Sequence, residues 1–235
     1  MSFFISLGIV LLAMLIMTFL QLQPSVFMLF YHYASGKYSK ARVSDITLFF
    51  ILGVETASAC LFLCSYYLVN LLFLFQSRPE SSIFAWVITG VLIALALISF
   101  FCYFRPGRGT KLFISRRSAQ SLDHNARKAS SRSDAFVLGA FSGLHELVFT
   151  LPLYIITSIE IAEMSVEFSP SYLLSLLYII APTIPLFVIR WSFKSGRNLA
   201  NIQRVRVHDK SFTRIILTTS YLAIAILTIF FRITP

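Results

Sequence analysis

The sequence predicts an all-α integral membrane protein, folded as a single polytopic domain over residues 1–235. Hydrophobic residues make up 57 % of the chain and charged residues 13 %, with a mean hydropathy of +0.79. A soluble domain has roughly 45–50 % apolar and 25 % charged residues. The apolar residues form long runs, and the basic residues lie between those runs. This pattern excludes a water-soluble enzyme, a disordered chain and a disulfide scaffold.

Six of the apolar runs are expected to cross the membrane, because one crossing needs about 20 apolar residues. In chain order the expected spans are approximately 3–34, 46–75, 83–104, 135–159, 171–190 and 212–231. The first run has no preceding positive region and no small-residue cleavage site, so we expect a retained helix rather than a signal peptide. Residue pairs that commonly cap helices, Ser44-Asp45 and Ser133-Asp134, are expected to start the second and fourth spans.

Basic residues predict how the spans are oriented. Of the 20 Lys and Arg residues, 18 lie in or beside the segments 35–45, 105–134 and 191–211. Positive loops mark the cytoplasmic face of a membrane protein, so orientation explains the charge better than a nucleic-acid partner does. The loop 105–134 is therefore expected in the cytoplasm, and both termini are expected outside. The turn at 76–82 and the acidic turn with Glu160, Glu163 and Glu167 should lie on the outer side of a bacterial cytoplasmic membrane.

Two carboxylates are predicted near the bilayer midplane. Glu55 follows Asp45 by ten residues and Glu146 follows Asp134 by twelve. These spacings correspond to about 15 and 18 Å along a helix. An ionisable residue in the membrane costs at least about 2.5–3.5 kcal/mol and by default suggests a functional site. The structural alternative is a protonated Glu that hydrogen-bonds a neighbouring helix.

Polar residues cluster around Glu146. Ser142 and Thr150 lie one helical turn before and after it, so all three would share one face. His145 would point about 100° away from that face. It could pair with Glu55, relay a proton or bond a backbone carbonyl. We therefore expect Glu55, Glu146, His145, Ser142 and Thr150 to bind a substrate or proton.

Prolines and glycines suggest broken and closely packed helices. Pro24, preceded by Gln23, and Pro152 should kink or break the first and fourth spans and free backbone groups for binding. Pro182 and Pro185 predict a hinge in the fifth span. The small-residue pair Gly139 and Gly143 predicts close helix packing, as does Gly53 in the second span. We expect Gln23 to take part in binding, and we expect helix breaks or hinges at Gly53, Gly143 and the four prolines.

Broken helices with midplane polar groups are typical of secondary transporters built as inverted repeats. Three spans per half, both termini outside and a proline in the first and fourth spans resemble the superfamily of LysE-type exporters and CcdA/DsbD-type thiol reductant carriers. The stretches 22–27 and 149–154 carry that resemblance. It implies a 3+3 inverted repeat. In the thiol carriers a reactive Cys adjoins each of those prolines, whereas Ser25 follows Pro24 here and no Cys lies near Pro152.

The sequence predicts a secondary transporter for a small solute or ion rather than an enzyme, and predicts no cofactor. One alternative is a membrane thiol-redox relay that uses Cys60, Cys64 and Cys102, although buried free cysteines usually act as small hydrophobic residues. Another is a non-catalytic membrane subunit that docks a partner through its basic loops. The expected partners are the bilayer and the solute. The sequence leaves open the solute, the coupling ion, a bound metal, a homo-oligomer and whether Glu55 meets Glu146.

Overall fold

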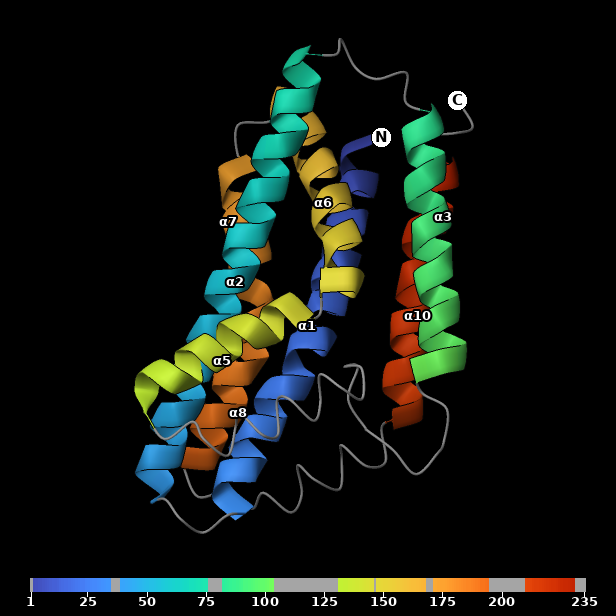
Figure 1. Ribbon diagram of the computed structural model, residues 1–235. Coiled ribbons are helices and arrows are strands. Elements are labelled where there is room, and N and C mark those ends of the chain that lie inside the picture. Colours follow the sequence, from blue (N-terminus) through green and yellow to red (C-terminus); the bar gives the residue numbers. More distant parts are fainter. Residues whose placement is uncertain are drawn as a thin grey trace.

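The computed structural model describes residues 2–34, 39–75, 82–103, 131–145, 147–167, 171–194 and 210–230, and every element within them is helical (Figure 1). The elements are α1 (Ser2–Ala34), α2 (Lys40–Phe75), α3 (Ser82–Ile98), the π-helical turn η1 (Ser99–Tyr103), α5 (Arg132–His145), α6 (Leu147–Glu167), α7 (Ser171–Ile180), the 3-10 turn η2 (Ala181–Thr183), α8 (Ile184–Lys194) and α10 (Lys210–Thr228). The helix α1 begins, and α10 ends, at the same end of the bundle (Figure 1).

Four of the described segments are long and apolar enough to cross a membrane: Phe3–Leu22, Lys40–Leu72, Leu147–Met164 and Tyr172–Trp191. Two shorter apolar helices, Ala85–Phe101 and Arg214–Thr228, lie in the third and sixth expected spans. The bundle is also apolar on its outside, where Phe4, Trp86, Tyr172 and Trp191 are all exposed. A soluble monomer rarely exposes so much apolar surface. The predicted all-α architecture with apolar helices of membrane-spanning length is confirmed in the described ranges.

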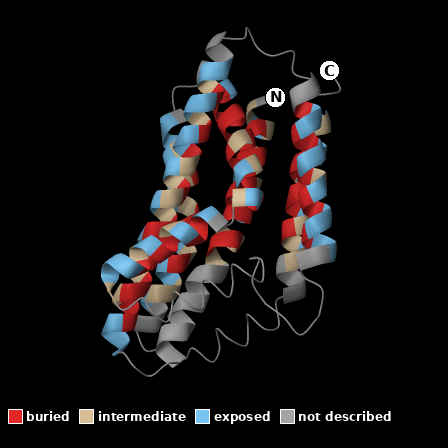
Figure 2. Cartoon of the chain, in the orientation of Figure 1, coloured by how far each residue is buried: buried red, intermediate tan, exposed pale blue. Residues whose placement is uncertain are grey.

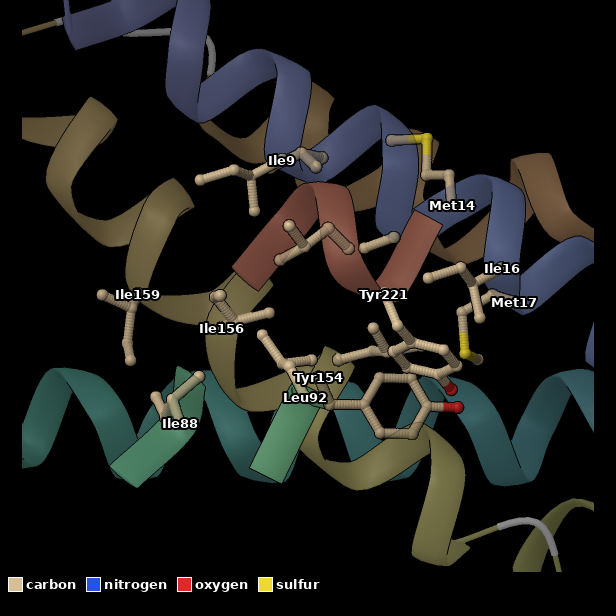
Figure 3. Close-up of a cluster of buried hydrophobic side chains, with 14 of the residues drawn as sticks. Ile9, Met14, Ile16, Met17, Ile88, Leu92, Tyr154, Ile156, Ile159 and Tyr221 are labelled. Carbon is tan, nitrogen blue, oxygen red and sulfur yellow. The ribbon is translucent and has the colours of Figure 1, made fainter. Parts of the chain in front are cut away.

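The helix α6 lies at the centre of the bundle and is buried on most of its faces (Figure 2). Its side chains pack with residues of α1, α3 and α10 in one core, where Tyr154 lies beside Tyr221 (Figure 3). The Tyr221 hydroxyl donates a hydrogen bond of 3.1 Å to the carbonyl oxygen of Phe149. Three aromatic rings extend this core to α2 and α7, with ring centroids 4.9 Å apart for Phe62 and Tyr178 and 6.4 Å apart for Phe62 and Tyr154.

The fourth expected span is not one helix over 135–159. The structure divides it into α5, which ends at His145, and α6, which begins at Leu147, and α5 crosses α2 obliquely while α6 follows the bundle (Figure 1). The second of these helices continues to Glu167, so Glu160 does not lie in an outer turn. It lies inside α6 with 2 % of its surface exposed. The residues on both sides of Glu160 are apolar and buried, so α6 continues through this position inside the core.

The prolines differ in whether they interrupt the helix that contains them. The helix α1 continues from Ser2 to Ala34, so Pro24 does not break it. Pro152 lies inside α6, and the carbonyl that it leaves without a helical donor belongs to Val148 in the first turn. Pro182 lies in η2, where α-helical geometry gives way to one 3-10 turn. Membrane helices tolerate proline where neighbouring groups satisfy the freed backbone, so a proline alone does not locate a break.

The second and fourth spans start earlier than expected, on serine caps. The backbone N–H of Arg42 donates to the Ser39 hydroxyl over 3.4 Å, and α2 starts at Lys40. At α5, Ser131 and Asp134 each bond the other's backbone N–H over 3.1 Å, in a reciprocal cap. The expected cap Asp45 therefore lies inside α2. Several nearby serines are equally suited by residue type to be the N-cap. The residue type alone therefore does not decide where the helix starts.

Candidate functional site

A buried polar pair joins α1 to α2. Gln21 is 2 % exposed, and its Nε2 donates a hydrogen bond of 3.0 Å to the hydroxyl oxygen of Ser58. The other polar atom of this amide, Oε1, is also buried and has no hydrogen-bond partner among the described residues. A buried acceptor without a donor costs about 1–3 kcal/mol, so this oxygen is a candidate ligand atom. Neither Gln21 nor Ser58 was among the residues expected from the sequence.

Glu55 lies one helical turn before Ser58 on α2. Its side chain is half-buried, and Oε2 is buried without a hydrogen-bond partner in the part of the chain that the structure describes. Residues three apart on a helix are neighbours, so Glu55 and Ser58 lie beside each other. Of the two carboxylates expected in the membrane, Glu55 is the one whose position the structure describes, and it lies next to the Gln21–Ser58 pair.

Helical geometry shows which way Glu55 faces. Ser44 lies about three turns before it and Phe62 about two turns after it, so the three share one face of α2. The carbonyl oxygen of Ser44 accepts a 2.9 Å hydrogen bond from Arg190 Nε on α8, and the Phe62 ring packs on Tyr178 of α7. Glu55 therefore lies on the side of α2 that faces α7 and α8, between those two contacts.

The 3-10 turn η2 lies between the same two contacts. Pro182 and Thr183 are buried there, and the Thr183 hydroxyl donates a hydrogen bond of 2.8 Å to the carbonyl oxygen of Ile180. The backbone N–H of Ile184 donates to Ala181 in place of Pro185, which has none. Pro182 likewise cannot donate to the carbonyl of Tyr178. The helix α1 packs against η2, and α2 packs against α7 and α8 on either side of this turn.

Glycines hold the opposite face of α2 against α5. A Cβ on Gly53 would collide with the carbonyl oxygen of Phe136 and come within 2.9 Å of the backbone nitrogen of Ala140. A Cβ on Gly139 would collide with the Phe50 carbonyl, and one on Gly143 would lie 3.2 Å from Ala57 Cβ. The close packing expected from these glycines is confirmed. It also separates Glu55 from α5, because Glu55 is on the other side of α2.

The expected cluster around Glu146 is divided by the change of helix. Ser142 lies on α5 and Thr150 on α6, so they do not share one continuous helical face. Both are buried, and neither hydroxyl has a hydrogen-bond partner within the described ranges. Glu146 lies outside the described residues, as do the side chains of His145, Gln23 and Cys102.

Cys60 and Cys64 are free and exposed on α2. Within the described residues, no group of three or more His, Cys, Asp and Glu side chains could hold a metal ion. The sequence also missed Glu160, whose burial depends on where α6 ends. In the sequence, the apolar residues Ile159, Ile161 and Ala162 on either side of Glu160 already favour a buried helix that continues through this position.

A charged cluster ties three helices together near the start of α2. Asp45 forms an ion pair of 2.8 Å with Arg132 of α5 and one of 4.0 Å with Arg190 of α8. The Arg132 guanidinium also lies 5.5 Å from the centre of the Phe49 ring. One carboxylate thus connects the helix before the α5–α6 change of direction with the helix after η2.

Searches against protein-family models, curated proteins and solved structures find no match to this chain.

Proposed function

We propose that this chain is a secondary transporter that moves a small solute or ion and binds it at Gln21, Glu55 and Ser58. One observation carries the proposal: two buried oxygen atoms, Gln21 Oε1 on α1 and Glu55 Oε2 on α2, lack partners among the described residues, and α1 packs against the interrupted turn η2. Buried oxygens at membrane depth are costly and favour a ligand. Transporters commonly bind substrate near the midplane where helices are interrupted.

The interruptions also suggest how access would alternate. The chain changes direction between α5 and α6, and α7 passes into α8 through η2. Asp45 ties α5 and α8 to α2 at one end, so breaking these ion pairs would free that end of the bundle. We propose that this state is closed at the charged end, and that α5 and α8 swing away when the site opens there.

Six crossings, an inverted repeat of the LysE and CcdA type and outer termini belong to the same proposal. Basic residues support the orientation: Lys40, Arg132 and Lys210 belong to the first turns of α2, α5 and α10, and Lys194 ends α8. These helix ends lie toward one end of the bundle (Figure 1). The positive-inside rule then assigns that end to the cytoplasm, and a bacterial cytoplasmic membrane would be the location.

The experiment is flux in proteoliposomes that contain a trapped pH indicator, under a clamped membrane potential. The external panel consists of small inorganic cations, small inorganic anions and the common amino acids. We expect saturable, protein-dependent flux of at least one member, lost in Glu55→Gln. The matched control is Thr56→Val, because Thr56 is exposed and its hydroxyl donates to the carbonyl oxygen of Leu52 on the same helix. Absence of protein-dependent flux, or equal flux in Glu55→Gln, would contradict the proposal.

A further inference from the structure

We infer that the Gln21–Glu55–Ser58 site takes a monovalent cation, either an alkali metal ion or a primary ammonium group. This inference rests on the proposed function and adds the class of substrate. It comes from the kind of atoms that the site leaves open, the charge that they carry and the surface that encloses them.

The open atoms are hydrogen-bond acceptors. Ser58 Oγ already accepts from Gln21 Nε2, which leaves Gln21 Oε1 and Glu55 Oε2 as buried atoms without partners among the described residues. A carboxylate oxygen accepts only, and an amide oxygen accepts only. An anion or another acceptor would add repulsion at both atoms. A metal cation or an ammonium group would satisfy both.

The charge of the site favours one positive charge. Glu55 contributes a single carboxylate, and the other described carboxylate on α2, Asp45, lies about 15 Å away along the helix and is paired with Arg132. No group of three or more metal-binding side chains occurs in the described ranges. A divalent ion at membrane depth would leave an unbalanced positive charge, and that is costly in low dielectric.

Aromatic packing closes one side of the site. Phe62 lies one turn beyond Ser58 and is buried, as are Tyr154 and Tyr178, which pack on it. This cluster excludes water and so strengthens the attraction between Glu55 and a cation. At η2, Pro182 has no N–H to donate to the Tyr178 carbonyl, and interrupted membrane helices commonly supply backbone oxygens that coordinate ions.

The test is thermal unfolding of the purified full chain at constant ionic strength in the chlorides of sodium, potassium, methylammonium and N-methyl-D-glucamine. The last cation is a bulky organic ammonium and sets the baseline. We expect at least one of the first three to raise Tm by about 5–10 °C at a concentration near 100 times its Kd. Alkali ions and methylammonium distinguish the two kinds of cation. Equal Tm in all four salts would overturn the inference.

Three variants sharpen the result. Glu55→Gln should lose the cation-dependent rise in Tm, and Thr56→Val, the adjacent lipid-side control, should keep it. Gln21→Glu adds a second carboxylate, which Ser58 can still bond, so magnesium or calcium should then raise Tm more than a monovalent ion does. If Glu55→Gln does not fold, the test rests on Gln21→Glu. An unchanged preference for monovalent cations in that variant would overturn the inference.

Flux measurements separate this inference from the proposed function. If a neutral or anionic solute shows Glu55-dependent flux and no monovalent cation changes Tm, the chain is a transporter and the inferred cation class is wrong. If no solute shows protein-dependent flux, the transporter proposal fails as well.

Discussion

Gln21 of α1 donates a 3.0 Å hydrogen bond to Ser58 of α2, across 37 residues of sequence and inside the apolar core of the bundle. Glu55 lies one turn from this bond and adds a buried oxygen without a partner among the described residues. The site thus combines one satisfied contact, which fixes α1 against α2, with open acceptors that await a ligand.

The bond between Gln21 and Ser58 should show energetic coupling in a double-mutant cycle. With Gln21→Leu and Ser58→Ala, we expect about 0.6 kcal/mol and at most about 1.7 kcal/mol, the range found for polar contacts between membrane helices. Unfolding in mixed detergent measures it. Thr18→Val is the matched control on α1, because the Thr18 hydroxyl bonds Met14 of its own helix, and it should not couple to Ser58→Ala. Equal coupling for the two pairs would contradict a specific bond.

Gly53 should not tolerate a methyl group. The Cβ of Gly53→Ala would collide with the backbone carbonyl of Phe136, so α5 would have to move, at a cost of about 1–3 kcal/mol in the free energy of unfolding. At Gly90 nothing lies within 4 Å of an added Cβ, so Gly90→Ala should instead stabilise by about 0.5–1 kcal/mol. Thermal unfolding checks both variants. A neutral Gly53→Ala would show that α2 and α5 do not pack on backbone.

Pro182 should act on transport rate more than on stability. Pro182→Ala restores an N–H that can donate to the Tyr178 carbonyl, which favours a continuous helix in place of η2. We expect a rate at least about tenfold lower, or about 1.4 kcal/mol of added barrier, with an unchanged half-saturation concentration. Pro152→Ala is the control, because α6 continues past its proline. A similar loss of rate in both variants would remove the special role of η2.

The ion pairs of Asp45 should hold one end of the bundle closed while adding little to stability. The side chains of Arg132 and Asp45 are 66 % and 43 % exposed, so Asp45→Asn should lower the unfolding free energy by no more than about 1 kcal/mol. It should nevertheless increase labelling of a cysteine at position 58 from the basic side. Lys40→Gln removes a charge at the same end and serves as the control. Equal labelling in both variants would argue against a closing role.

The membrane class and the close α2–α5 packing were predictable because they depend on local patterns. A long apolar run predicts a spanning helix wherever it occurs. Gly139 and Gly143, one turn apart, predict close packing against any neighbouring helix. Glu55 stood out for a similar reason, since a carboxylate in an apolar run is costly in any membrane fold.

The partners of Glu55 were not predictable in the same way. Gln21 and Ser58 are ordinary polar residues, and only the packing of α1 on α2 brings them together. Glu160 was expected in a turn because acidic residues follow it, but the core contacts of Ile159 and Ile161 extend α6 past it. Pro24 and Pro182 both lie in long apolar runs, whereas α1 continues past Pro24 and Pro182 lies in a 3-10 turn.

The most direct measurement is the accessibility of a cysteine that replaces Ser58, in a background with Cys60, Cys64 and Cys102 changed to Ser. A membrane-impermeant thiol reagent is applied to oriented vesicles from one side and then, separately, from the other. Retained flux in the cysteine-free background would also exclude the redox alternative. An alternating-access transporter exposes position 58 to each side in turn, so we expect labelling from both sides, slowed by the transported solute. Labelling from only one side, or from neither, would contradict a transport site at Gln21, Glu55 and Ser58.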